Sequence, residues 1–255
     1  MKKRLPLILL IGLALVIVAA AAGFMFLGSI VKAGVEKGGP YITKVPVTLD
    51  GATISVFNGS GQLKGFVMGN PEGFKSKEAV RVGSVALKLE PGSVLGDKII
   101  VRSIRVEGPE ITYEAALGGS NIGKILENIQ SVASTDKTAP EQPGSSKPLQ
   151  VDLFIISGAK LNVTDSVIGG TAVTLPLPEI RLDNLGQGPE GITAADLSAK
   201  VFGEVVEASA KAVTANAVKL GGNITDATKN LGTSAKDSAK KAASGITDLF
   251  KKNTP

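Results

Sequence analysis

The side chains that most enzymes use for proton transfer, nucleophilic attack or metal binding are scarce in this chain. It has no histidine and no cysteine, which excludes the usual zinc sites, Ser-His-Asp triads and Cys-His pairs. Ser238 and Lys241 have the spacing of a Ser-Lys pair, but they lie in a repetitive Ala/Lys-rich stretch where such matches are common. The scattered acidic residues lack calcium-loop spacing: Asp152, Asp165, Glu179, Asp183 and Glu190. We therefore expect no enzyme activity, no bound metal and no cofactor.

The glycine-rich segment at residues 59–65 has a superficial likeness to a phosphate-binding loop. Its third glycine comes one residue late, and a strand-like stretch follows where such a loop requires a helix. Aromatic residues make up 4% of the chain, which argues against stacking platforms for sugars or single-stranded nucleic acid. The net charge of +5 makes an anionic membrane surface a natural counterpart. We expect no nucleic-acid partner.

The first thirty residues predict a membrane anchor that positions the rest of the chain. Lys2, Lys3 and Arg4 precede a run without charge over residues 5–30, which reaches the length of about 20 residues that a bilayer requires. The positive-inside rule places the N-terminus in the cytoplasm and everything after Lys32 across the membrane. A cleaved signal peptide is the alternative, although the run exceeds the apolar region of a usual signal. Either reading exports the domain.

Two stretches of alternating apolar and polar residues predict β-structure. The first covers residues 41–134 and ends in a short helix, because Ile122, Ile125, Leu126 and Ile129 share one helical face. The second covers residues 150–193. A Pro/Ser-rich linker or loop at residues 135–149 separates them.

The connections between the predicted strands are short and rich in turn residues. They favour an α+β fold built on one curved, mainly antiparallel sheet that meanders from strand to strand. One face of the sheet is apolar and the other polar, as in a sheet that is open to solvent on one side.

Residues 194–255 form an Ala/Lys-rich tail with a helical apolar stripe. Its stripe can pack on the sheet, or the basic helix can lie on anionic lipid. The sequence leaves both alternatives open.

Several short motifs resemble the N-terminal region of AsmA-like proteins, and their order carries the likeness. After the anchor-like start comes Gly69-Asn70-Pro71-Glu72-Gly73-Phe74, then a strand-like segment at residues 99–107 that ends in Gly108-Pro109. Asn121-Ile122 opening a short helix fits the same pattern, and so does the later segment at residues 177–186. The chain resembles a short member of this family.

The resemblance implies a periplasmic protein, single-pass in the bacterial inner membrane, with a taco-shaped sheet around an apolar groove. It implies a role in envelope or outer-membrane biogenesis in which the groove handles phospholipid acyl chains. The alternative is a structural or chaperone-like module that binds other envelope proteins and no lipid. The residues expected to line the groove, or else to form core beneath the helices, are Val85, Leu87, Leu89, Ile104, Val106, Leu153, Ile155, Leu161 and Val163.

Overall fold

A computed structural model describes residues 27–55, 57–116, 119–136, 147–164 and 173–216. Nearly all of the predicted anchor over residues 1–30 lies outside these ranges, as do most of the linker and the tail beyond residue 216. Within the described ranges, no helix has both the length and the apolar character needed to cross a membrane.

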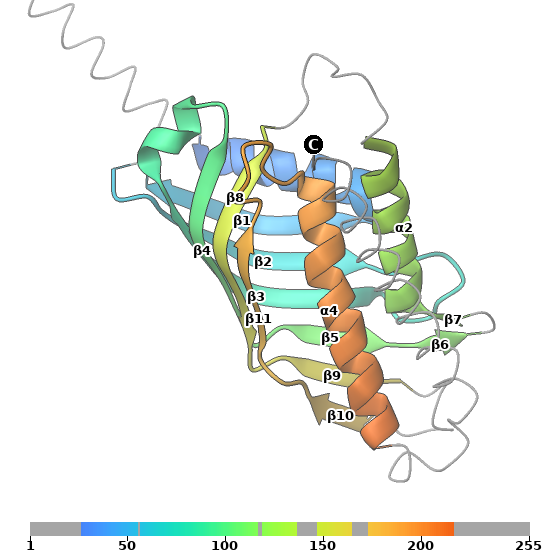
Figure 1. Ribbon diagram of the computed structural model, residues 1–255. Coiled ribbons are helices and arrows are strands. Elements are labelled where there is room, and N and C mark those ends of the chain that lie inside the picture. Colours follow the sequence, from blue (N-terminus) through green and yellow to red (C-terminus); the bar gives the residue numbers. More distant parts are fainter. Residues whose placement is uncertain (1–26, 56, 117–118, 137–146, 165–172, 217–255) are drawn as a thin grey trace, which may run out of the picture.

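Nine strands form one large sheet, and two more form a small hairpin (Figure 1). The large sheet contains β1 (Val47–Ser55), β2 (Ser60–Gly69), β3 (Glu78–Leu89), β4 (Ile99–Glu107), β5 (Glu110–Tyr113), β8 (Leu149–Ser157), β9 (Lys160–Val163), β10 (Val173–Pro176) and β11 (Ile180–Leu185). The hairpin pairs β6 (Ala115–Ala116) with β7 (Gly119–Ser120).

The sheet is mixed, which corrects the prediction of a simple meander. Strands β1, β2 and β3 follow one another in antiparallel order, but β3 is then bordered by β4 along one half and by β5 along the other. The next strands, β8 and β9, lie parallel to β4 and β5. Local alternation cannot reveal this arrangement, because a strand's pattern is the same whether its neighbour runs parallel or antiparallel.

A line of glycines crosses the sheet where it bends. A row of paired residues joins Gly51, Lys64, Ser84, Glu107 and Ser157 across five strands. Beside this row, glycines in β2 and after β4 and β8 have positive φ angles near 60°: Gly65, Gly108 and Gly158. Glycine adopts this conformation without the penalty that a side chain would incur. The arm formed by β4, β8 and β11 therefore turns away from β5, β9 and β10, as Figure 1 shows.

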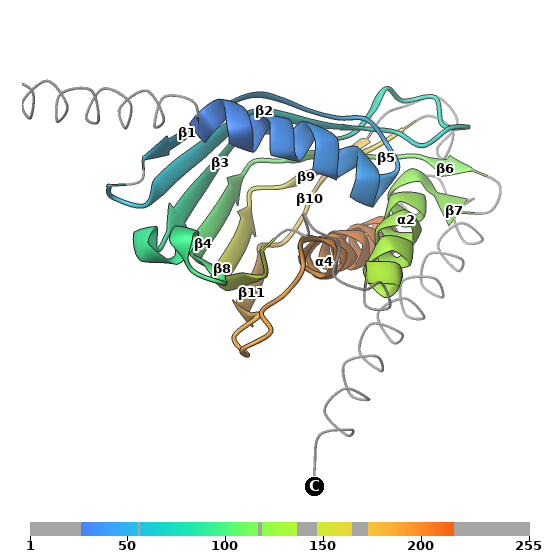
Figure 2. The ribbon, with the colours of Figure 1, turned by 90° about the horizontal axis from the view of Figure 1, so that it is seen from above.

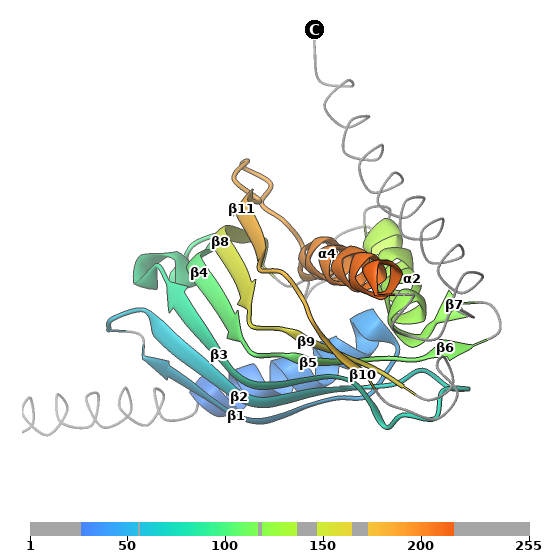
Figure 3. The ribbon, with the colours of Figure 1, turned by 90° about the horizontal axis from the view of Figure 1, so that it is seen from below.

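Helices occupy the concave side of the sheet, as the view in Figure 3 shows. They are α2 (Asn121–Asp136) and α4 (Ala194–Ala215), which contact each other. The short 3-10 helix η1 (Pro91–Leu95) connects β3 to β4. The short helix predicted to begin at Asn121 is thus confirmed, and it extends to Asp136. Thr193 is the N-cap of α4, because its hydroxyl accepts a hydrogen bond from the backbone N–H of Asp196 at 3.0 Å.

One core joins the concave face to these helices. The helical stripe predicted in α2 is buried, with Ile122 and Ile125 fully shielded from solvent. From α4, Phe202, Val206 and Val213 enter the same cluster. A second, smaller cluster lies under the other arm of the sheet around Val101, Val151 and Leu185.

The helix at residues 27–43 runs along the free edge of β1 (Figure 2). Its contact residues recur on one helical face. A side chain at Gly28 would meet the carbonyl of Ala52, and one at Gly39 would meet the side chain of Val47. Between them, the Glu36 carboxylate accepts a hydrogen bond from the N–H of Leu49 at 3.1 Å. The helix therefore runs antiparallel to β1, with residue 27 near the β1–β2 turn.

Candidate functional site

The concave face of the sheet carries continuous rows of apolar side chains. Residues directly opposite each other on paired strands share a face, so the pairing registers define these rows. One row crosses β1, β2, β3, β5, β9 and β10. Its members are Val47, Met68, Val80, Ile111, Leu161 and Leu175. All six are buried beneath the helices, which makes this half of the face ordinary core.

A second set of apolar side chains lies on the other half of the concave face and is only half-buried. One of its rows runs through Ile54, Gly61, Leu87, Ile104, Phe154 and Leu182. Beyond this row, Leu89 pairs with Val101, Val101 with Val151 and Val151 with Leu185, and the last three are buried in the smaller cluster. On the other side of the first row, the neighbouring row begins with Ala52, Leu63 and Val85 and becomes buried at Val106, Ile156 and Ile180. We call the half-buried members the apolar strip: Ile54, Leu63, Val85, Leu87, Ile104, Phe154 and Leu182.

The apolar strip is the candidate functional site, because large apolar side chains are left partly open to solvent across six strands. Scattered apolar residues at a surface need no explanation, but a contiguous patch marks a binding surface more often than chance. Protein covers part of this surface. Ile104 and Phe154 pack against both core clusters, Val85 packs against the main cluster and Leu182 against the smaller one. Every side chain in the strip is apolar, so the strip offers no group for proton transfer, nucleophilic attack or metal binding.

Three of the residues expected from sequence belong to the strip: Val85, Leu87 and Ile104. Leu89 is also half-buried, and it packs against the smaller cluster. Val106, Leu161 and Val163 are buried members of the main core. For these three, the alternative of core beneath the helices is the one that the structure shows.

Leu153 and Ile155 lie on the opposite, convex face. They alternate in β8 with Phe154 and Ile156, which contact the main core, and neighbouring residues of a strand point to opposite sides. Their cross-strand partners agree, because Leu153 pairs with Asp183 and Ile155 with Arg181. The run at residues 153–156 is apolar on both faces, so alternation could not tell which residues turn inward.

Sequence reasoning missed Ile54, Leu63, Phe154 and Leu182. Each is an ordinary strand residue in its own segment, and nothing local separates it from core. The signal appears only when registers are known, because Leu87 joins Ile104, then Phe154, then Leu182 across β3, β4, β8 and β11.

The motif residues expected from the resemblance hold a loop in place. Asn121 is fully buried, and its side-chain amide donates to Asn70 Oδ1 and to the carbonyl of Thr112, each at 2.8 Å. Asn70 in turn donates to the carbonyl of Ser76 at 2.7 Å. Pro71, Gly73 and Phe74 lie in the loop between these two residues, and Gly73 adopts a φ of 91°. The motif thus fastens the β2–β3 loop to the start of α2.

Glu114 completes this buried polar cluster. Its side chain is 3% exposed and accepts hydrogen bonds from the backbone N–H groups of Lys75 (2.7 Å) and Ser76 (2.8 Å) and from the Ser76 hydroxyl. Burial by itself raises the pKa of the Glu114 carboxyl, but these hydrogen bonds outweigh burial, and the net pKa lies below the ordinary value. Every partner is internal, so the cluster serves structure.

The remaining motif residues sit at two strand contacts. Gly69 donates its N–H to the carbonyl of Pro46 at 2.8 Å. Gly108 donates to the carbonyl of Ser157 at 2.8 Å, and Pro109 accepts from Lys160 at 2.9 Å. These bonds keep the bent segments between β4 and β5 and between β8 and β9 in register.

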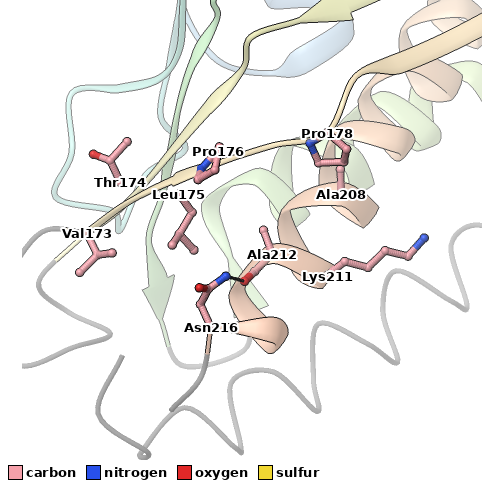
Figure 4. Close-up of a pocket in the computed structure, with 9 residues that line it drawn as sticks. All are labelled: Val173, Thr174, Leu175, Pro176, Pro178, Ala208, Lys211, Ala212 and Asn216. Atoms are coloured by element: carbon pink, nitrogen blue, oxygen red, sulfur yellow. Dashed lines mark hydrogen bonds between the residues drawn. The ribbon is translucent and has the colours of Figure 1, made fainter. Parts of the chain in front are cut away.

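A hollow of about 600 Å³ lies between β10 and the second half of α4 (Figure 4). Val173, Leu175, Pro176 and Pro178 line it from the strand side. From α4, Lys211 stands at its rim and pairs with Glu207. The hollow is apart from the strip and contains no cluster of groups suited to catalysis. In the described ranges, no three acidic residues approach closely enough to hold a metal ion.

Comparison with known protein families shows the family to which this chain belongs. The model of the AsmA family matches residues 61–245, which is more than half of the chain. The match covers β2 through α4 and therefore most of the strip and the whole Asn70–Asn121–Glu114 cluster. A search among curated proteins finds no match. The chain belongs to the AsmA family.

Proposed function

We propose that this protein is a non-enzymatic, membrane-anchored periplasmic module of envelope biogenesis, and that its apolar strip holds a phospholipid acyl chain. Membership of the AsmA family is consistent with an envelope function. The observation that carries the lipid assignment is the unbroken row Ile54–Gly61–Leu87–Ile104–Phe154–Leu182, half-buried at every side chain.

The dimensions of the strip suit an extended hydrocarbon chain. Strands in a sheet lie about 4.8 Å apart, so a row across six strands spans about 24 Å. Covering its side chains removes apolar area from water, at about 25 cal/mol for each Å². Gly61 lies within the row, and a side chain there would approach Ile54 and Leu87. The row is therefore lowest at Gly61, where the two flanking side chains converge.

The alternative function, pairing of a client strand with an exposed sheet edge, has less support. The edge of β1 is covered by the helix at residues 27–43, which bonds the backbone of Leu49. The sheet also ends at β10 and at β11, and of these β10 ends in Pro176, with Pro178 following it. Proline cannot donate a hydrogen bond to an added strand.

The test is photo-crosslinking in cells whose phospholipids carry radiolabelled phosphate. A photoreactive amino acid replaces Leu87 in the full chain, and the control replaces Ala86, its exposed neighbour on the convex face. The proposal expects a labelled adduct from position 87 and none from position 86. It also expects Ile104→Asn to reduce the adduct at position 87. Equal labelling at both positions, or none at either, would refute lipid binding in the strip.

If position 87 captures protein and no lipid, the client-binding alternative is supported. The mass of the captured partner then identifies it. Circular dichroism of each variant, compared with the parent, confirms that the fold is retained.

A further inference from the structure

Large apolar side chains are exposed mainly at one end of the molecule. In the described ranges the exposed large apolar residues are Ile30, Tyr41, Phe57, Val94 and Leu95. Phe57 is 86% exposed in the β1–β2 turn, and Leu95 is 92% exposed at the end of η1. Both side chains lie in connections between strands, and most of the surface of each is exposed.

The β1–β2 turn and η1 are neighbours. The N–H of Leu89 donates to the carbonyl of Gly59 at 2.6 Å. A side chain at Gly59 would also meet Pro91, the first residue of η1. Phe57 and Leu95 are thus two tips of one surface, which we call the apolar end: Phe57, Val94 and Leu95.

The helix at residues 27–43 begins at the same end. Gly28 packs against the carbonyl of Ala52, five residues before Phe57 on the chain. Figure 2 shows the start of this helix on the side where the β1–β2 turn and η1 protrude. Ile30, on the first turn of the helix, is 63% exposed. Tyr41, the remaining exposed residue of the set, lies on the last turn of the helix, at the far end.

The chain before residue 27 makes a lipid surface the fitting partner. Residues 5–26 carry no charge and exceed the length needed to cross a bilayer core. As the anchor in the proposed function, on which this inference rests, such a segment would bring the beginning of the helix, and with it the apolar end, to the membrane surface.

The charges around the apolar end agree with an anionic lipid surface. The Lys147 ammonium donates to the carbonyls of Val94 (3.1 Å) and Gly96 (2.9 Å), and Lys98 donates to Gly188 at 3.0 Å. Two acids flank η1, Glu90 and Asp97, and Glu90 pairs with Arg102 at 3.0 Å. The cations Lys98, Arg102 and Lys147 thus outnumber them. Exposed aromatic and aliphatic tips flanked by lysines match the chemistry of the headgroup region.

We infer that the apolar end inserts Phe57 and Leu95 into the boundary between headgroups and acyl chains of the membrane that carries residues 5–26. This contact does not require a lipid in the strip. If the proposed function holds as well, the strip gains a membrane-facing entrance, because Ile54 lies three residues before Phe57.

The absence of tryptophan in the chain permits a direct test. Full-length Phe57→Trp and Leu95→Trp are each reconstituted into vesicles of phosphatidylethanolamine and phosphatidylglycerol with brominated acyl chains, which quench nearby tryptophan. The matched control is Tyr41→Trp, an exposed aromatic position at the far end of the same helix. The inference expects strong quenching and a blue-shifted emission for Phe57→Trp and Leu95→Trp, and neither for Tyr41→Trp.

Quenching at positions 57 and 95 no greater than at position 41 would overturn the inference. That result would leave the proposed function intact, because the adduct at Leu87 is measured independently. Conversely, quenching at both tips without any lipid adduct at Leu87 would support membrane docking and remove the lipid-handling proposal.

Discussion

Glu36 and Leu49 join the N-terminal helix to the edge of the sheet. The carboxylate of Glu36 accepts the N–H of Leu49 at 3.1 Å, while the ammonium of Lys32 donates to the carbonyl of the same residue. Lys32 and Glu36 also pair with each other at 3.2 Å. Two side chains thus satisfy the two backbone groups that a neighbouring strand would otherwise bond. Because free edges invite pairing with other chains, this helix protects the sheet as well as connecting it to the preceding segment.

Removing the Glu36 carboxylate should open this edge. Glu36→Ala leaves the N–H of Leu49 without its acceptor, so amide hydrogen exchange at Leu49 should become faster than in the parent. The amide of Phe66 in β2 serves as the internal reference, since Phe66 lies inside the sheet between β1 and β3. Unchanged exchange at Leu49 would show that the helix does not protect the edge through this bond.

The close approach of the helix depends on a glycine, and the same helix offers a matched control. A side chain at Gly28 would clash with the carbonyl oxygen of Ala52, whereas nothing lies within 4 Å of one at Gly34. Gly28→Ala should destabilise the protein by about 1–3 kcal/mol through overpacking. Gly34→Ala should stabilise it by up to about 1 kcal/mol, because alanine is the better helix former. Denaturant unfolding of both variants measures the difference, and equal effects would contradict the close contact.

The two halves of the concave face should respond differently to truncation. Leu161 is fully buried, so Leu161→Ala should cost about 2–5 kcal/mol through lost burial and the cavity that remains. Leu87 is half-buried in the strip, and Leu87→Ala should cost less than about 2 kcal/mol, since less area returns to water. Denaturant unfolding of both variants measures the two losses in free energy of unfolding, and the loss should be larger for Leu161→Ala. A larger cost at Leu87 than at Leu161 would mean that the strip belongs to the core.

The buried Glu114 carboxylate should stabilise the fold through its charge. Lys75 N–H approaches one carboxylate oxygen and Ser76 N–H the other, so the NH₂ group of a glutamine must face at least one donor. Glu114→Gln should therefore cost about 1–3 kcal/mol. Glu110→Gln, an exposed change in β5, should leave the free energy of unfolding unchanged.

The same carboxylate should make the stability depend on pH in the acid range. The folded state lowers the pKa of Glu114 below its ordinary value of 4.5, so its contribution is fully present above that pH. It is lost as pH falls through 4.5 toward the lowered pKa, because the folded state binds this proton less readily than the unfolded state. The stability difference between the parent and Glu114→Gln should narrow over this range in urea titrations. A difference that widens toward low pH would contradict the lowered pKa.

Part of this protein follows from the sequence alone, because some signals are local. The period of Ile122, Ile125, Leu126 and Ile129 was enough to predict α2, since a helix satisfies its own backbone and needs only one buried face. The alternation along residues 45–49 and 85–89 was likewise enough to predict strands β1 and β3. The order of the short motifs around Asn70, Gly108 and Asn121 indicated the AsmA family, to which the chain belongs.

The tertiary structure decided which side chains form the candidate site. Whether Leu161 is core and Leu87 half-open depends on which rows the helices α2 and α4 cover, and neither residue's own neighbours in sequence carry that information. The pairing of β4 with β8, far apart in the chain, placed Phe154 beside Ile104 and turned Leu153 and Ile155 outward. A sheet has a period of two, so one bend or bulge exchanges its faces. Strand identity is therefore readable from sequence, whereas the face that each residue presents is fixed only when distant strands pair.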